Sequence, residues 1–96
     1  MKKLTIYCSE ALSEDIQHIL HHYDLEGFIH EPGMVATKFK PKGSYGKDMS
    51  WQTNIFIVFP DDEQLEGIVG ELKHYINACA IEPCLRIVVT SVDLIY

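Results

Sequence analysis

The stretch from Ile55 to Phe59 constrains the fold of this chain most, because all five of its consecutive residues are apolar. Successive side chains of a β-strand point to opposite faces of a sheet, so a strand of this composition is covered on both faces. Pro60 follows at once and ends the strand. The sequence therefore predicts a strand over residues 51–59 in a sheet with two buried faces.

Two amphipathic helices flank this strand in the sequence. Apolar residues recur at helical spacing over 10–24, behind Ser9, which is a candidate N-cap. A second helical pattern follows the strand and begins at Asp61 with the spacing of a capping box. Gly67 and Gly70 each cost this helix about 1 kcal/mol relative to Ala. Tertiary packing must therefore stabilise it.

Three further strands complete the pattern. Alternating residues predict a short strand over 4–8, a second strand begins at 28, and a last strand covers 85–94. Residues 33–52, rich in Pro and Gly, are predicted as a long loop, and strand-like ends of this loop stay open as an alternative. The order β-α-β-loop-β-α-β is the α+β, ferredoxin-like βαββαβ arrangement, a four-stranded antiparallel sheet with two helices on one face. All 96 residues then form one domain.

One face of the predicted sheet has no cover within the chain. Two helices cover one face only, whereas the strands over 51–59 and 85–94 are apolar on both faces. An exposed apolar face of this extent marks an interface, and a partner subunit is its simplest cover. The sequence therefore predicts an oligomer.

Charge and hydropathy exclude several classes of function. The 8 basic and 14 acidic residues give a net charge of −6, which is unfavourable for binding nucleic acid. No apolar run approaches the roughly 18–20 residues that span a bilayer, and no signal-peptide pattern follows the first residues. We therefore expect a cytoplasmic protein without membrane insertion.

Three cysteines are too few for a secreted disulfide scaffold. Cys8 is predicted to lie in the core. Cys79 and Cys84 are interpreted as two reduced thiols packed beneath a connector. Two alternatives stay open: a disulfide that closes the loop between them, or a metal site shared with His74.

The predicted loop carries a cluster of positive charge. Half of the basic residues lie within ten positions that contain no acidic residue, and the other 86 residues carry 4 basic and 14 acidic side chains, a balance of 4 − 14 = −10. The four clustered residues are Lys38, Lys40, Lys42 and Lys47. A cationic loop on an acidic body can steer anions or an acidic partner surface. The alternative is a solvated loop that serves solubility.

A histidine cluster lies on the polar side of the first predicted helix. Its candidate metal ligands are Glu14, His18, His21 and His22. Histidines at i, i+4 on one helix face chelate zinc, copper or nickel. The pattern holds no general base, so it predicts binding of a divalent transition metal without catalysis. The alternative is a polar helix face in contact with solvent.

Two aromatic residues flank the predicted loop. Trp51 either stacks on a ligand or anchors the loop by burying apolar area, and His30 lies at the other end of the loop. The sequence contains no Ser-His-Asp arrangement, no P-loop and no dinucleotide fingerprint. It therefore predicts a protein that is not an enzyme.

Four stretches of the chain together resemble a known family: Met1–Ile6, Leu25–Phe28, Asn54–Asp62 and Leu65–Val69. They are similar to the PII-like superfamily of trimeric ferredoxin-like signalling proteins, which includes the CutA-type proteins. The resemblance covers nearly the whole chain as architecture and implies a homotrimer whose open sheet faces stack together. It also implies a mobile loop between the second and third strands, where residues 33–52 fall.

The resemblance implies a regulatory function in signal transduction. Such proteins bind a small effector (an anion, a nucleotide or a metabolite) between subunits, and their loop contacts a target protein such as a transporter or an enzyme. Arg86 falls where these proteins place a basic residue, so the resemblance assigns it to the charge of the effector. Together with Trp51 and the four loop lysines it forms the predicted effector and partner site.

One segment departs from the PII pattern. PII proteins proper carry a glycine-rich segment for nucleotide phosphates before the last strand, whereas residues 77–85 here contain no glycine. Backbone amides approach phosphate less closely without glycine. The chain is therefore interpreted as a divergent member. CutA-type proteins are associated with metal-ion biology, so a metal-binding or metal-stress protein remains the alternative.

Overall fold

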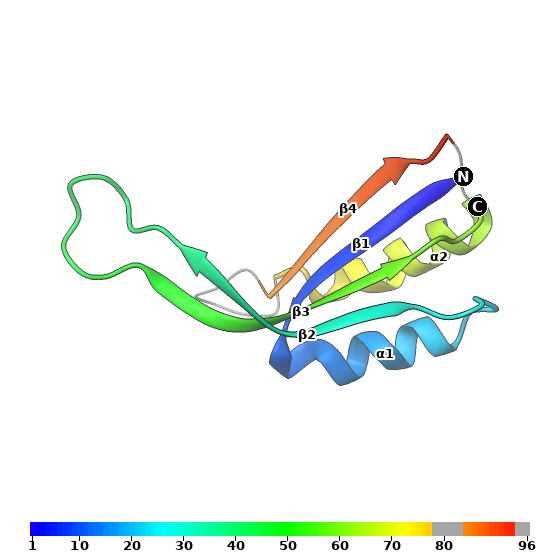
Figure 1. Cartoon of the computed structure of the whole chain (residues 1–96), viewed down its shortest axis with the longest axis horizontal. Coiled ribbons are helices and arrows are strands. Elements are labelled where there is room, and N and C mark those ends of the chain that lie inside the picture. The colour runs from blue at the N-terminus through cyan, green and yellow to red at the C-terminus, as the bar shows by residue number, and fades with distance from the viewer. Residues whose placement is uncertain (78–83, 94–96) are drawn as a thin grey trace.

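The computed structural model describes residues 1–77 and 84–93 and contains four strands and two α-helices in the predicted order. The elements are β1 (Lys2–Ser9), η1 (Glu10–Leu12), α1 (Ser13–His21), β2 (Ile29–Lys38), β3 (Met49–Val58), α2 (Asp62–Leu72), η2 (Lys73–Tyr75) and β4 (Leu85–Ser91). The strands form one sheet in the order β2-β3-β1-β4, and every neighbouring pair is antiparallel (Figure 1). The predicted ferredoxin-like fold is confirmed.

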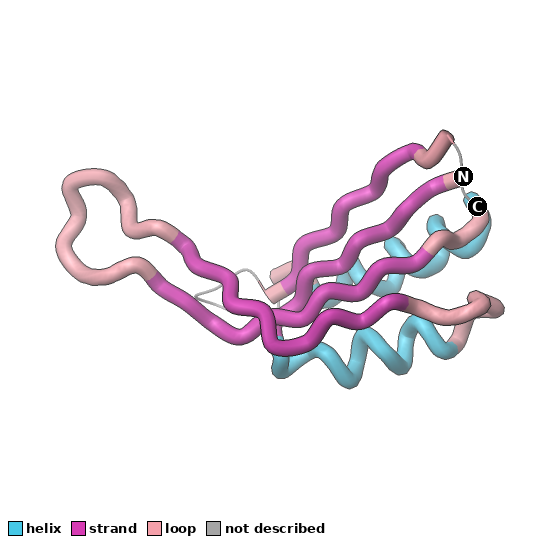
Figure 2. The backbone as a smooth tube through the Cα atoms, viewed as in Figure 1, coloured by secondary structure: helices cyan, strands magenta, loops and turns pink. Residues whose placement is uncertain are grey.

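The core lies between one face of the sheet and the two helices, which share that face (Figure 2). Leu4 of β1 is paired with Val58 of β3 and with Val89 of β4, and β3 is also paired with β2, so β1 and β3 are central. Phe56 is the largest fully buried side chain among the residues that the structure describes. Other fully buried residues come from β1, α1 and α2: Leu4, Ile6, Ile16, Ile68 and Leu72. The predicted strand over 51–59 thus supplies the centre of the core.

The second helix begins with the predicted capping box. The Asp61 carboxylate accepts a hydrogen bond from the Gln64 backbone N–H at 2.7 Å, and Gln64 Oε1 accepts one from the Asp61 N–H at 3.0 Å. The prediction for Ser9 holds in part. It occupies the N-cap position of η1, but its hydroxyl makes no capping bond and is buried without a partner.

Close packing between the helices explains one of the two glycines of α2. A Cβ at Gly67 would lie 2.7 Å from the hydroxyl oxygen of Tyr23. That hydroxyl donates a hydrogen bond to the Glu71 carboxylate and so joins the end of α1 to α2. A Cβ at Gly70 meets nothing within 4 Å. None of the helices in the described parts of the chain has the length and apolar composition to cross a membrane.

The predicted loop over 33–52 is mostly a hairpin. β2 continues to Lys38 and β3 begins at Met49, so the connecting loop is residues 39–48 only. We call residues 33–52 the arm and residues 39–48 the tip loop. A register shift between Glu31 and Met34 marks the start of the arm, which extends beyond the other strands (Figure 1). The ends of the predicted loop are strands, and their sequence signal is weak because the arm is exposed on both faces and shows no apolar alternation, with Val35 63% exposed.

The sheet face opposite the helices is open in the single chain. Strand alternation places on it the partly exposed side chains of Tyr7, Ile29, Ile55, Ile57 and Val88. Ile29 is 53% exposed. We call this surface the open face. It matches the uncovered apolar face that the sequence predicts.

The cysteines differ from expectation at one position. Cys8 is a buried free thiol on β1, as predicted. Cys84 is disulfide-bonded, so the interpretation of a reduced thiol at this position is wrong. Cys79 lies outside the described residues, as do the positions 78–83 of the segment that lacks glycine. The sequence shows that Cys79 and Cys84 lie close together in the chain, but spacing alone does not predict whether they are oxidised.

Candidate functional site

The tip loop is closed by its own hydrogen bonds. The Ser44 backbone N–H and hydroxyl both donate to the Pro41 carbonyl, at 3.1 and 2.6 Å. Gly43 has a φ of 79°, as the third residue of a type II turn requires. Towards the end of the loop, Asp48 Oδ1 accepts a hydrogen bond from the Lys40 backbone N–H at 2.8 Å. The tip loop therefore has a defined shape in addition to its charge.

The structure brings the four predicted lysines to one end of the molecule. Lys38 ends β2, and the other three belong to the tip loop: Lys40, Lys42 and Lys47. All four are exposed, and no described residue pairs with their ammonium groups. Phe39 is 78% exposed and Tyr45 is 102% exposed, so two aromatic rings stand among the positive charges. The tip loop thus presents cations and apolar area together.

The two residues at the base of the arm have different surroundings. Trp51 is half-buried on β3 and is paired with Ala36 of β2. His30 stacks on Phe56, with ring centroids 4.3 Å apart, and its Nε2 is 2.8 Å from Asn54 Oδ1. His30 is therefore part of the packing on the helix side of the sheet, where it satisfies the buried amide oxygen of Asn54. Ligand stacking by Trp51 stays a prediction.

Arg86 lies apart from the lysines, on the part of the chain outside the arm, which we call the body. It is exposed on β4 and is paired with Tyr7 of β1, so strand alternation places both side chains on the open face. The structure therefore separates the predicted effector residue from the predicted partner residues. A site that uses Arg86 lies on the surface that a second subunit is expected to cover.

The predicted metal ligands lie on or just after α1, and binding of a metal by a pair of them stays a prediction. Glu14, His18, His21 and His22 are all exposed on or beside α1. Among the described residues, no group of three or more His, Cys, Asp or Glu side chains is arranged to hold a metal ion. His21 instead packs edge-on against Phe28, with ring centroids 5.7 Å apart.

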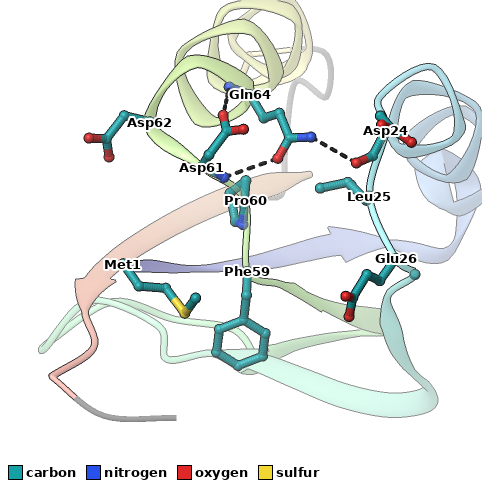
Figure 3. A pocket seen from close by; sticks show the side chains of 10 residues that line it. Met1, Asp24, Leu25, Glu26, Phe59, Pro60, Asp61, Asp62 and Gln64 are labelled. Atoms are coloured by element: carbon teal, nitrogen blue, oxygen red, sulfur yellow. Dashed lines mark hydrogen bonds between the residues drawn. The ribbon is translucent and has the colours of Figure 1, made fainter.

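A cavity that the sequence analysis missed lies at the opposite end of the chain from the tip loop. It has a volume of about 840 Å³ and is bounded by the start of β1, the α1–β2 connection and the start of α2 (Figure 3). Its lining residues include Met1, Leu25, Phe59, Pro60, Gln64 and four acidic residues. The acidic residues are Asp24, Glu26, Asp61 and Asp62. We call it the acidic cavity, and its charge is unfavourable for a phosphate or bicarbonate.

One hydrogen bond fixes the shape of this cavity. Gln64 Nε2 donates to the Asp24 carbonyl at 2.8 Å, which joins α2 to the α1–β2 connection (Figure 3). The signal in the sequence was the pair of acidic segments, 24–26 and 61–62, that each border an element end. Their proximity depends on antiparallel packing across the sheet and was not visible in either segment alone.

Two titratable groups of the body are held in their neutral forms. The hydrogen bond to Glu71, followed by burial and the negative charge of Glu71, raises the pKa of Tyr23 to about 12. Burial raises the pKa of the Cys8 thiol to about 11. A thiol with so high a pKa is a weak nucleophile at neutral pH because little thiolate is present. Both groups therefore act as packing residues.

Comparisons with known proteins define the fold. No protein-family model and no curated protein matches the sequence. Among solved structures, CPII from Thiomonas intermedia K12, a nitrogen regulatory PII-like protein bound to ADP, AMP and bicarbonate, is 18% identical, with a TM-score of 0.69 over 93% of this chain and 86% of that chain. The ATP complex of GlnK from B. subtilis is 9% identical, with a TM-score of 0.74 over 96% of this chain and 82% of that chain.

A third match points the same way. A putative PII-like signalling protein from Thermus thermophilus is 14% identical, with a TM-score of 0.64 over 93% of this chain and 83% of that chain. The chain therefore has the fold of PII-like proteins, as the resemblance implied.

Proposed function

We propose that this protein is a regulatory module of the PII-like kind that binds a small anionic effector or nucleotide and contacts a target protein through its arm. The observation that carries the proposal is the likeness of the whole fold to PII-like proteins, including structures with ADP, AMP, bicarbonate or ATP bound. The cationic arm on an acidic body supports it, because such an arm attracts acidic partners.

The effector is proposed to bind between subunits, at the edge of the open face. The acidic cavity is a poor anion site, whereas Arg86 places a permanent positive charge on a surface that is apolar around it. Tyr7, opposite Arg86, is partly exposed and offers a ring and a hydroxyl to the same ligand. A second subunit laid on the open face would enclose this site.

A homotrimer is proposed to create that enclosure. Ile29, Ile55, Ile57 and Val88 leave apolar area on the open face of a single chain. Removing such area from water is favourable by about 25 cal/mol per Å², and this term opposes the entropy that subunits lose on association. Light scattering of the purified protein is expected to give three times the mass of one chain. We expect this assembly to work in the cytoplasm and to regulate its target without catalysing a reaction.

Calorimetric titration with ADP, AMP, ATP and bicarbonate tests the proposal. At least one of these is expected to bind saturably, and Arg86→Gln is expected to weaken binding about 10- to 150-fold, because a charge-assisted hydrogen bond contributes about 1.5–3 kcal/mol. Lys73→Gln is the matched control, since Lys73 is an exposed cation of η2. The proposal is overturned if none of the four ligands binds at millimolar concentration.

A further inference from the structure

The two ends of the molecule carry opposite charge. The tip loop has three lysines, Lys40, Lys42 and Lys47, and stands at one end of the long axis (Figure 1). The acidic cavity lies at the other end and is lined by four acidic residues: Asp24, Glu26, Asp61 and Asp62. The principal extents of the chain are 47 × 27 × 22 Å, so a chain cannot place its own tip loop in its own cavity.

The tip loop is convex and presents an aromatic ring. Tyr45 lies between Gly43 and Gly46, which both have positive φ, and it protrudes fully into solvent. The bonds from Ser44 to Pro41 hold the turn before it. A ring held outward by a closed turn loses little conformational freedom on binding. Tyrosine is favoured at interfaces because it buries apolar area and keeps a polar end.

The acidic cavity offers the matching surface. Leu25, Phe59 and Pro60 contribute apolar area, and the carboxylates lie around it (Figure 3). One carboxylate, that of Asp61, is used by the capping box. Those of Asp24, Glu26 and Asp62 have no hydrogen bond or ion pair with any described residue. The volume of about 840 Å³ falls within the range of about 300–1,000 Å³ that is typical of ligand pockets.

We propose that the tip loop of one copy docks in the acidic cavity of a second copy, with Tyr45 over the apolar lining and the lysines beside the free carboxylates. The charge complementarity of the two surfaces selects this occupant, and both surfaces belong to the same chain. The contact is heterologous, because it joins two different surfaces, so it runs head to tail. It goes beyond the proposed function: a docked tip loop is withheld from any target.

The contact adds to the assembly by the open face and does not replace it. Docking uses opposite ends of the long axis, whereas subunits stacked through Ile55 and Ile57 use the sheet between them. If each assembly carries several arms, the contacts between two assemblies act together and gain effective concentration. Charge pairs at the surface are screened by salt, so association is expected to fall as ionic strength rises.

Sedimentation velocity with a charge swap tests the proposal. Wild-type protein in about 20 mM salt is expected to associate beyond its basal assembly and to dissociate at about 0.5 M. The tip variant Lys42→Glu with Lys47→Glu, and the cavity variant Asp24→Lys with Glu26→Lys, are each expected to weaken this association at least tenfold. An equimolar mixture of the two variants restores opposite charges across the contact, so it is expected to recover most of the association.

The matched control changes the same charge elsewhere. Glu10→Lys with Glu66→Lys alters two exposed acidic residues outside the cavity and is expected to associate like the wild type. The proposal is overturned if the wild type shows no salt-sensitive association, if the control weakens it as much as the cavity variant does, or if the mixture shows no recovery. The last result would assign the tip and the cavity to different partners.

A photo-crosslinker at position 45 gives a second reading that does not depend on charge. Cross-links are expected to map to residues 24–27 and 59–64 of another copy and to fall in the cavity variant. Cross-links that map to the open face, or to no second copy, contradict the proposal. Because nucleotide binding is measured separately by calorimetry, failure here leaves the proposed regulatory function standing, and the reverse also holds.

Discussion

The body and the arm of this protein differ in how much of their side-chain surface is buried. In the body, Leu4, Ile6 and Phe56 are fully buried between the sheet and the helices. In the arm, two paired strands have solvent on both faces, and Val35 and Tyr45 are largely exposed. Hydrophobic burial stabilises the body, whereas the arm depends on hairpin hydrogen bonds, which alone give marginal stability. Because the core of the body includes no residue of the arm, the arm is available for the proposed contact with a target.

The largest expected effect comes from a truncation in the body. Phe56→Ala removes the largest fully buried side chain, which contacts Phe28 edge-on and carries the stacked ring of His30. It is expected to lower the free energy of unfolding by about 3–5 kcal/mol in urea denaturation. Val35→Ala in the arm is expected to change it by less than about 0.5 kcal/mol. Equal losses would contradict the division into body and arm.

Replacing the two glycines of α2 by alanine is expected to change the free energy of unfolding in opposite directions. Gly70→Ala is expected to raise the free energy of unfolding by about 0.5–1 kcal/mol, because alanine favours the helix and its Cβ has open space. Gly67→Ala is expected to lower it by about 1–2 kcal/mol, because its Cβ overlaps Tyr23. Thermal unfolding of both variants measures the sign. A gain at Gly67 would show that the Tyr23 ring moves aside at little cost.

A smaller change in the free energy of unfolding is expected at high pH. The pKa of Tyr23 is raised to about 12 in the folded protein, from an ordinary value of 10. Between pH 10 and 12 the unfolded chain has lost this proton and the folded chain keeps it, so stability falls as pH rises through this window. Below pH 10 the contribution is fully present. The buried Cys8 thiol adds a fall in the same direction from pH 9 to 11.

The variant Tyr23→Phe isolates the tyrosine, because it keeps Cys8. Urea denaturation from pH 9 to 12 is expected to show a shallower loss of stability for this variant than for the wild type. Parallel curves would mean that the hydrogen bond to Glu71 does not hold the proton in solution.

The smallest effect on stability is expected in the arm. Replacing Lys38, Lys40, Lys42 and Lys47 together with Gln removes four exposed charges that pair with no described residue. The melting temperature and the subunit assembly are expected to stay nearly unchanged, while binding to an acidic partner or an anion at the arm is lost. A variant that unfolds or dissociates would show that the arm is packed into the assembly.

The sequence predicted the body well because packing leaves periodic patterns. Ile55 to Val58 and the box from Asp61 to Gln64 each carry a local signal, and the structure confirms the strand and the capping box. The strands of the arm carry no such signal, since neither face of them is buried. The acidic cavity joins Asp24 and Glu26 to residues far along the chain, so only the sheet topology reveals it.

The candidate site was predictable in part for the same reason. Clustering of lysines between positions 38 and 47 is local and was visible, and the structure places all four at one end. Their separation from Arg86 follows from the length of the hairpin, which composition does not encode. The spacing of the histidines on α1 was also local and predicted a chelate. The described residues hold no group of three or more metal ligands, so a chelate by two of these side chains stays a prediction.

Hydrogen–deuterium exchange with and without ADP tests most directly the proposed regulatory function, for which we expect that an effector bound to the body orders the arm. In the free protein the amides of residues 33–52 are expected to exchange rapidly, while those of β1 and of the buried end of β3 are protected. Saturating ADP is expected to slow exchange in the arm and around Arg86. Binding of ADP that leaves exchange in the arm unchanged, or an arm already as protected as β1 in the free protein, would contradict the account.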